Sequence, residues 1–276
     1  MKFPFKLNAY TKISQWLPFL PKCYHPKFIF EKSLNTDDYC KSVSSLKFNT
    51  TFKTTEKKRH LKSNDSLKKY ITENSIILDI GASTGITSQE LIHNVDRFKK
   101  YFVTDFNLYI KYFVSKNNIT YILNNDNVPI LIATDYLVCY PQESRVAQHL
   151  FKHGIEEAKE KHMQTLLIEP NLMKITQENK NIHILEYNIF DKWQYEQPNI
   201  IKIANLLNRV YFSDNLITEA LLNMLHLLPE NGILQIVENR EQEQGALYKK
   251  HMGQFEKISH IHKGTNIDDL ILSIRI

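Results

Sequence analysis

Cysteine and glycine are scarce in this sequence, and long apolar runs are missing. Its 276 residues include three cysteines, Cys23, Cys40 and Cys139, which is an odd number at wide spacing. Neither a disulfide framework nor a zinc knuckle is therefore expected, and a reducing, cytoplasmic compartment fits best. No His-Glu-x-x-His or Cys-x-x-Cys spacing occurs, so no metal site is predicted. The 7 glycines by themselves indicate nothing about function.

Apolar stretches are too short to cross a membrane. A spanning helix needs roughly 18 apolar residues, whereas the longest candidates are residues 76–80 and the amphipathic segment 220–228. The N-terminal apolar patch, residues 16–21, is twice interrupted by proline, unlike the core of a signal peptide. With 42% hydrophobic residues, the chain has the composition of a folded protein with one sizeable core.

Positive charge is concentrated at the start of the chain. Residues 1–70 contain 15 Lys and Arg against 5 Asp and Glu, and the remaining residues contain 20 against 25. A basic arm of this kind is able to contact nucleic acid, an anionic membrane surface or an acidic substrate. A lysine-rich, solvated surface is the simpler interpretation.

The pattern of the chain changes near residue 73. Residues 1–72 contain prolines and scattered aromatic residues, which predicts short helices and loops in a basic N-terminal extension that is able to act as a lid. Residues 73–276 show buried strands alternating with amphipathic helices, which is typical of a parallel sheet with crossover connections. We expect strands at 76–80, 101–104, 182–185, 200–204 and 233–237, helices at 86–95 and 215–228, and a C-terminal antiparallel hairpin formed by 255–262 and 270–276.

A second segment interrupts this alternation. About 76 residues separate Asp105 from the strand at 182–185, more than one helix with short loops requires, so an insertion is predicted at about residues 112–180. Within it, segments 119–123 and 130–133 flank a turn-rich sequence, which predicts a β-hairpin. A helix is expected to follow at about residues 145–161.

A glycine turn and a carboxylate mark the predicted ligand site. Gly81 and Gly85 lie between the first strand and the following helix, where glycine lets the backbone approach a ligand closely. The positive end of that helix is able to receive an anionic group. Asp105 ends the next strand, 20 residues beyond Gly85, and is therefore expected beside the same crevice, where it is able to accept two ribose hydroxyls.

The segment Leu-Asp-Ile-Gly-Ala-Ser-Thr-Gly at residues 78–85 resembles the first motif of class I S-adenosylmethionine-dependent methyltransferases, L-D-[IVL]-G-x-G-x-G. Ser83 stands where that family usually has its middle glycine. The resemblance implies a Rossmann-like α/β fold with helices on both faces of a mostly parallel sheet, and S-adenosylmethionine as the cofactor. It also implies a cofactor site that includes Asp79, Gly81, Ala82, Ser83 and Gly85. For Asp79, direct contact and a role in orienting the turn both remain open.

Later segments resemble further motifs of the same family, in the same order along residues 73–276 apart from the insertion. Residues 103–107 are similar to the second motif, which implies that Asp105 binds the ribose and that Phe106 or Asn107 lies against the adenine. Residues 182–189 resemble the third, with Asn188 as the acceptor from the adenine amino group, Ile189 beside it and Asp191 as an alternative acceptor. Residues 227–234 resemble the sequence before the fifth strand.

The fourth strand, residues 200–204, resembles the family strand whose end lies beside the transferred methyl group, which implies a cofactor contact at Ala204. Asn205 and Tyr211 follow it and are the candidate catalytic residues, although both are also able simply to satisfy backbone groups in a loop. A general base is optional, and Glu238 is a further candidate.

The resemblance implies transfer of a methyl group to an O, N or C atom of a small-molecule or protein acceptor. A nucleoside-binding protein without catalysis and a nucleotide-linked oxidoreductase are the alternatives. Nucleic acid is not the expected acceptor because the chain has neither an Asn-Pro-Pro-Tyr nor an Asp-Pro-Pro-Tyr sequence. The acceptor itself and the oligomeric state are not indicated by the sequence.

Overall fold

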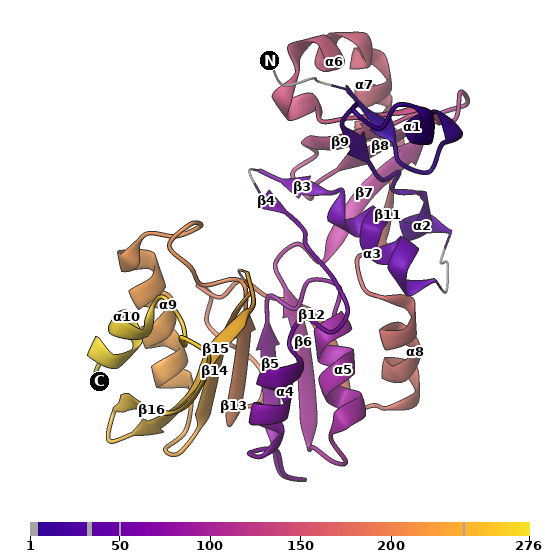
Figure 1. The fold of residues 1–276 in the computed structure, drawn as a ribbon. Helices are drawn as coiled ribbons and strands as arrows, with labels where there is room; N and C mark the ends of the chain where they lie inside the picture. Colours follow the sequence, from indigo (N-terminus) through magenta and orange to yellow (C-terminus); the bar gives the residue numbers. More distant parts are fainter. Residues whose placement is uncertain (1–4, 32–34, 50, 240) are drawn as a thin grey trace. The chain divides into compact units, whose positions relative to one another are not determined.

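The computed structural model describes residues 5–31, 35–49, 51–239 and 241–276 (Figure 1). Residues 1–4, 32–34 and 50 of the predicted extension lie outside this description. The chain forms two compact units. The first unit comprises Met1–Glu56 and Asn107–Asn171, and the second comprises Lys57–Phe106 and Leu172–Ile276. The N-terminal segment and the inserted segment therefore share one unit, an arrangement that the sequence did not suggest.

The second unit is built on a seven-stranded sheet with the order β12-β6-β5-β13-β14-β15-β16. Its first five strands pair in parallel, and β15 and β16 are added antiparallel at one edge. This is a Rossmann-like, mostly parallel sheet, so the predicted fold class is confirmed. In chain order the strands are β5 (Ile76–Ile80), β6 (Lys100–Asp105), β12 (Ile182–Glu186), β13 (Ile200–Ala204), β14 (Ile233–Asn239), β15 (Glu243–His251) and β16 (Gln254–Ile261).

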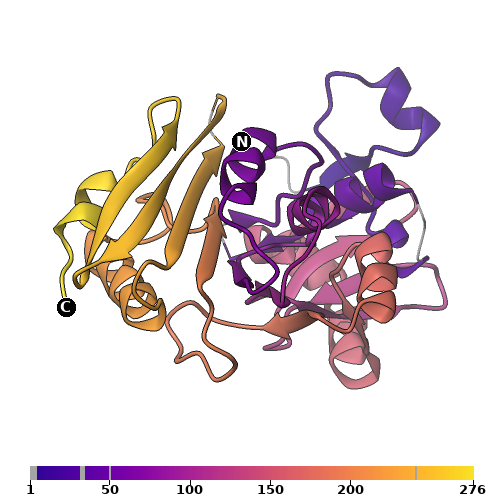
Figure 2. The ribbon, with the colours of Figure 1, turned by 90° about the horizontal axis from the view of Figure 1, so that it is seen from below.

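Helices cover both faces of this sheet (Figures 1 and 2). Leu78 and Ile80 of β5 belong to the core that includes α9 (Asp214–Leu227) and α10 (Asp268–Ser273). Because side chains alternate along a strand, Asp79 points to the opposite face, where its carboxylate accepts a hydrogen bond from α5 (Ile86–Asn94). The helix α4 (Leu61–Lys68) contacts α5 and β15. The remaining helix, α8 (Pro170–Glu178), precedes β12.

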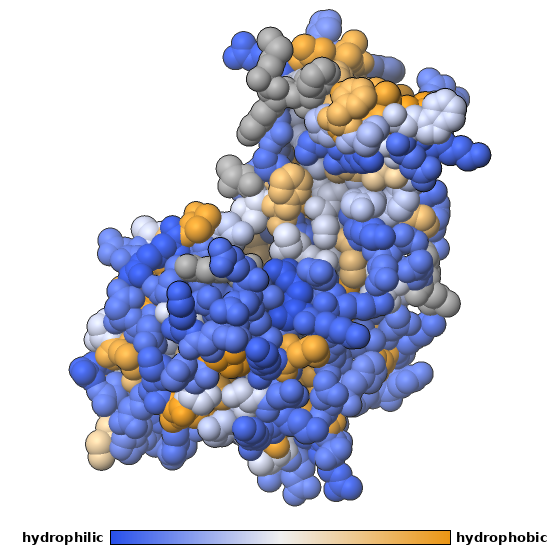
Figure 3. Space-filling view, viewed as in Figure 1, coloured by the Kyte–Doolittle hydropathy of each residue, from blue (hydrophilic) through white to orange (hydrophobic). Residues whose placement is uncertain are grey.

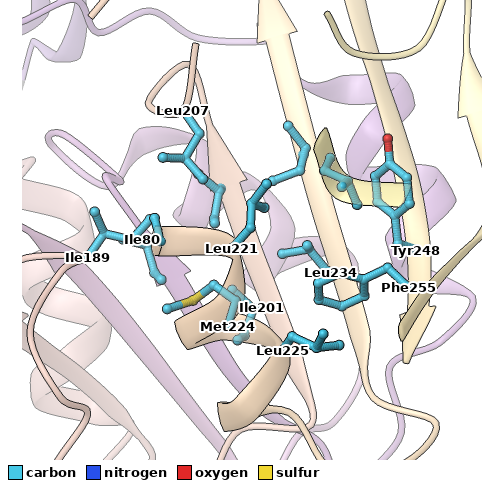
Figure 4. Packing of buried hydrophobic residues seen from close by; sticks show 14 of the residues in the cluster. Ile80, Ile189, Ile201, Leu207, Leu221, Met224, Leu225, Leu234, Tyr248 and Phe255 are labelled. Atoms are coloured by element: carbon cyan, nitrogen blue, oxygen red, sulfur yellow. The ribbon is translucent and has the colours of Figure 1, made fainter. Parts of the chain in front are cut away.

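The apolar face of α9 explains why this helix packs on the sheet. Its buried residues, Ile217, Ala220, Leu221, Met224 and Leu225, recur at the three- and four-residue spacing of one helix face. Figure 4 shows Leu221, Met224 and Leu225 against strand residues of the same core. Across the described ranges, no helix combines the length and the apolar character needed to cross a bilayer.

The C-terminal hairpin differs from the predicted one. An antiparallel hairpin is present at this edge, but its strands are β15 and β16. Residues 270–273 of the expected last strand belong to α10, and Arg275 forms an isolated antiparallel bridge with Gln254. Met252 and Gly253 form the two-residue connection, both with positive φ, which is the geometry of a tight hairpin turn. A methionine at such a position is a weak turn signal, and the two acidic residues that begin α10, Asp268 and Asp269, were a missed sign of a helix N-terminus.

The first unit contains its own seven-stranded sheet, with the order β11-β7-β8-β9-β10-β1-β2. The segments that the sequence marks as a hairpin are β8 (Thr120–Leu123) and β9 (Pro129–Ala133), which pair antiparallel. The other strands are β1 (Phe5–Asn8), β2 (Lys22–Cys23), β7 (Tyr109–Val114), β10 (Leu137–Cys139) and β11 (Met163–Leu166), with a separate pair of β3 (Lys47–Phe48) and β4 (Thr51–Phe52).

Helices of the first unit lie in two groups. The helices α1 (Lys12–Trp16), α2 (Lys27–Phe30) and α3 (Thr36–Ser44) come from the N-terminal segment. The helices η1 (Pro141–Glu143), α6 (Arg145–Leu150) and α7 (Lys152–Lys161) come from the inserted segment. Residues 5–56 were expected to form helices and loops, yet they also supply β1 and β2 to the sheet, because strands of two to four residues are too short to leave a periodic signal.

Candidate cofactor site

Four parallel strands bring most of the predicted site residues to one edge of the second unit. From β5 the chain continues outward to β6 and β12 on one side, while β13 and β14 lie on the other. Strand order therefore reverses at β5. In open α/β sheets, ligands bind outside the carboxyl ends of the strands at such a reversal. The turn after β5, the end of β6 and the loop after β13 all follow carboxyl ends of this sheet.

The turn that joins β5 to α5 has an unusual backbone conformation. Gly81, Ser83 and Gly85 have φ values of 72°, 58° and 78°. This left-handed conformation costs roughly 1–2 kcal/mol for a residue with a Cβ atom, and almost nothing for glycine. Two of the three positions therefore carry the residue type that the backbone favours, and Ser83 bears the conformational cost.

Leucine side chains occupy the space beside both glycines. A Cβ atom on Gly81 would lie 3.0 Å from Cδ2 of Leu206, and one on Gly85 would overlap the side chain of Leu172. Backbone conformation and close packing are thus sufficient to explain both glycines. Their contact with a ligand stays a prediction.

Asp105 and the turn are joined directly. The carboxylate Oδ2 of Asp105 accepts a hydrogen bond from the backbone N–H of Ser83 at 2.8 Å, and the Asp105 residue is 9% exposed. The proximity expected from the sequence is therefore present. The hydroxyl oxygen of Ser83 is buried and has no hydrogen-bond partner among the described residues. An unsatisfied buried polar atom costs about 1–3 kcal/mol, so this atom marks a place where a polar ligand atom would be stabilised.

The carboxylate of Asp79 lies inside the second unit. Its Oδ2 accepts hydrogen bonds from Ser88 Oγ at 2.8 Å, from the Tyr101 hydroxyl at 2.9 Å and from Lys202 Nζ at 2.8 Å. Asp79 and Lys202 are 1% and 0% exposed. Burial, and next the charge of Asp79, raise the pKa of Tyr101, which keeps this hydroxyl a donor. The geometry favours a role for Asp79 in fixing the strand before the turn.

Asn205 is connected to two other elements. Its Oδ1 accepts a hydrogen bond from the backbone N–H of Asn239 at 2.6 Å, which directs Nδ2 toward His60 Nε2 at 3.2 Å. Because Nδ2 is a donor, Nε2 of His60 acts as the acceptor and the proton of the neutral ring is on Nδ1. His60 is 3% exposed, and burial, followed by the positive charge of Lys202, lowers its pKa to about 2.

Sequence reasoning missed His60. Its neighbours are Lys57, Lys58 and Arg59, and such a run of cations is typical of a solvated surface. No signal in the sequence places this ring under the ends of β13 and β14. The hydrogen bond that Asn205 accepts from the Asn239 backbone agrees with the interpretation that Asn205 satisfies a backbone group in the loop after β13. A catalytic role of Asn205 stays a prediction.

Other predicted residues occupy the same edge with differing exposure. Ala82 and Ala204 are each 9% exposed, and the backbone N–H of Ala82 donates to the carbonyl oxygen of Thr104 at 2.9 Å. Phe106 follows Asp105 and is 59% exposed, so its ring offers an apolar surface. Tyr211 lies in the turn after β13 and is 48% exposed.

Asn188 and Asn107, two of the predicted adenine contacts, already form hydrogen bonds within the protein. The side-chain oxygen of Asn188 accepts from the backbone N–H of Phe190 at 3.3 Å. Asn107 belongs to the first unit, where its carbonyl oxygen accepts from Lys53 Nζ at 2.9 Å. The side chain of Ile189 is part of the hydrophobic core of the second unit.

No protein-family model matches the sequence, and no curated protein is significantly similar to it. Solved structures do match. The N-methyltransferase NodS from Bradyrhizobium japonicum WM9 is 14% identical with a TM-score of 0.36, over 65% of this chain and 66% of that one. Its complex with S-adenosyl-L-homocysteine matches at 13% identity and a TM-score of 0.34, over 66% and 63%.

Human N-acetylserotonin methyltransferase, in complex with SAM, is 12% identical with a TM-score of 0.32, over 64% of this chain and 33% of that one. The chain therefore spans less than two thirds of the length of these solved chains. Both of these proteins are methyltransferases. With TM-scores below 0.5 and identities of 12–14%, these matches carry no argument about the activity or the acceptor of this chain.

Proposed function

We propose that the chain is an S-adenosylmethionine-dependent methyltransferase that acts on an O, N or C atom of a small-molecule or protein acceptor. The observation that supports this most is the hydrogen bond between Ser83 N–H and Asp105 Oδ2. It joins the turn after β5 to the carboxylate at the end of β6, where strand order reverses. The resemblance of residues 78–85 to a methyltransferase motif favours S-adenosylmethionine as the nucleoside that binds at this edge.

The residues at this edge suit the parts of that cofactor. Asp105 presents a carboxylate, which is the group that accepts from two ribose hydroxyls at the end of the second strand in nucleotide-binding sheets. The buried hydroxyl of Ser83, which has no hydrogen-bond partner in the described part of the chain, and the positive end of α5 suit a carboxylate of the cofactor. The exposed ring of Phe106 suits an adenine face. We infer that Asp79 supports the turn instead of touching the cofactor.

When bound, S-adenosylmethionine supplies a methyl group on a sulfonium, from which a neutral thioether departs. The protein therefore needs to contribute chiefly orientation and exclusion of water. In this proposal Ala204 and Asn205 form the wall beside the acceptor, and Asn205 keeps the loop after β13 in its left-handed bend, with φ of 56°. The hydroxyl of Tyr211 is the group proposed to contact the acceptor.

Calorimetry tests the proposal with S-adenosylhomocysteine and NAD as ligands of the full chain. S-adenosylhomocysteine is expected to bind and NAD is not. Asp105→Ala removes charge-assisted hydrogen bonds worth about 1.5–3 kcal/mol, so affinity is expected to fall roughly 10–100-fold. Asp96→Ala is the matched control, because Asp96 is exposed in the loop before β6, at the opposite edge of the sheet.

Binding of NAD without S-adenosylhomocysteine would contradict the proposal and favour a nucleotide-linked oxidoreductase. Unchanged affinity in Asp105→Ala would remove the ribose assignment. If S-adenosylhomocysteine binds but no methyl transfer to any acceptor in a metabolite and protein screen is found, the nucleoside-binding alternative is favoured.

A further inference from the structure

The first unit exposes large apolar side chains close to its N-terminus. Trp16 is 84% exposed and Phe19 is 76% exposed, and Ile13 on α1 is 44% exposed. The three recur every third residue across α1 and the turn that follows it. Figure 3 shows hydrophobic side chains next to hydrophilic ones over the N-terminal elements of the first unit. Burying two aromatic rings would contribute favourable hydrophobic free energy, which is absent while they face water. Their exposure therefore indicates a surface that contacts an apolar partner.

The segment that carries these side chains is held firmly by the sheet. Its two ends are fixed by hydrogen bonds from Leu7 N–H to the Pro21 carbonyl oxygen and from Ala9 N–H to the Cys23 carbonyl oxygen, both at 2.8 Å. Between them, the hydroxyl of Ser14 donates to the Thr11 carbonyl oxygen at 2.7 Å. The apolar side chains are therefore presented outward from an ordered backbone.

The charge carried by the segment itself has one sign. Residues 5–30 contain four lysines and no aspartate or glutamate, and Lys12 and Lys22 are exposed. Burial, and next the charge of Lys27, lower the pKa of His25 to about 4, so this ring is neutral near pH 7.

Carboxylates that neighbour this segment on other elements are engaged elsewhere. Asp38 lies near Tyr10, whose hydroxyl is 3.4 Å from the Asp38 carbonyl oxygen, and Asp38 Oδ2 accepts from Asn35. Asp135 follows β9 and accepts through Oδ1 from Asn118. Bonds from neutral amides leave both carboxylates charged, but among the residues that the structure describes no ion pair joins Lys12 or Lys22 to a carboxylate. The positive charge of these two lysines is therefore available to an anionic partner.

We propose that Ile13, Trp16 and Phe19, flanked by Lys12 and Lys22, form a membrane-contact surface that binds anionic bilayers peripherally. Tryptophan is enriched where bilayers meet water, and exposed lysines are attracted to anionic headgroups. Apolar insertion combined with cationic attraction is the pattern of peripheral membrane binding. This proposal does not depend on the methyltransferase proposal.

Vesicle sedimentation tests it, with phosphatidylcholine vesicles that contain or lack phosphatidylserine. The protein is expected to sediment with the anionic vesicles and not with the neutral ones. The double variant Lys12→Gln/Lys22→Gln is expected to bind about 25-fold more weakly, from roughly fivefold per lysine. Trp16→Ser/Phe19→Ser is expected to reduce binding by at least about tenfold. Met252→Ser is the matched control, since Met252 is 81% exposed in the second unit.

Tryptophan fluorescence provides an independent readout. The only other tryptophan, Trp193, is 8% exposed in the core of the second unit, so a blue shift on adding vesicles reports insertion of Trp16. Circular dichroism of each variant verifies the fold. Equal binding to neutral and anionic vesicles, or no binding to either, overturns the proposal. Binding to single-stranded RNA instead of vesicles overturns it too, in favour of a base-stacking surface.

Discussion

Replacing Lys202 with methionine removes the cation from the ion pair that lies two residues before the glycine turn. Lys202 on β13 stands in register between Asp79 on β5 and Gln235 on β14, and both members of the pair are almost fully buried. Methionine has nearly the same length and no charge. Among the described residues, the variant therefore leaves the Asp79 carboxylate with the hydroxyl donors Ser88 and Tyr101.

The expected effect is large. Breaking a buried ion pair by removing one partner costs about 3–5 kcal/mol, because the other charge is left buried without its partner. We therefore expect Lys202→Met to lower the free energy of unfolding by about 4 kcal/mol at pH 7, a large part of the 5–15 kcal/mol typical of a folded domain.

The double variant distinguishes loss of the ion pair from a packing defect. Asp79→Asn should also lower the free energy of unfolding, because it leaves the buried ammonium of Lys202 without its carboxylate. The double variant Asp79→Asn/Lys202→Met removes both charges and should recover most of the loss, whereas two independent packing defects would add.

Urea unfolding followed by Trp193 fluorescence measures these free energies in the second unit, because Trp193 lies in its core. Lys100→Met is the control, since Lys100 pairs with Glu196 at the start of β6 where both side chains meet solvent. It should lose less than about 1 kcal/mol, as is usual for an ion pair that meets solvent. A loss of less than about 1 kcal/mol in Lys202→Met, or single losses that simply add in the double variant, would contradict this explanation.

Two further predictions concern the same edge of the sheet. Ser83→Ala removes a buried hydroxyl that has no partner among the described residues, so it should keep or slightly increase stability while weakening S-adenosylhomocysteine binding about tenfold, as measured by calorimetry. Unchanged affinity would remove Ser83 from the cofactor site. Because burial lowers the pKa of folded His60 to about 2, the unfolded chain alone binds that proton below about pH 6.5, and stability should fall by about 1.4 kcal/mol per pH unit as pH drops. Urea unfolding of His60→Gln should lack this contribution, and an identical acid slope in both proteins would contradict it.

The parallel half of the sheet was predictable because its strands are short continuous apolar runs separated by turn residues. β5, with its glycine turn, and β13 were expected almost to the residue. The proximity of Asp105 to the turn followed from the rule that neighbouring parallel strands end at the same edge. These features depend on local sequence and on connection rules alone.

Other features depend on contacts between distant residues. Lys202 is a single charge within an apolar strand and was not singled out in the sequence, because the register that pairs it with Asp79 is a property of the folded sheet. His60 gives no sign of burial within its basic run. The glycines show a different limit of sequence-based prediction. The sequence does not distinguish a glycine that makes room for Leu172 or Leu206 from a glycine that makes room for a ligand.

A crystal structure of the protein with S-adenosylhomocysteine bound is the decisive test of the cofactor site. We predict ribose hydroxyls within hydrogen-bond distance of the Asp105 carboxylate, and the amino-acid end of the ligand beside the Ser83 hydroxyl. A ligand seated elsewhere on the chain, with Asp105 and the turn after β5 untouched, would show that the proposed site is wrong.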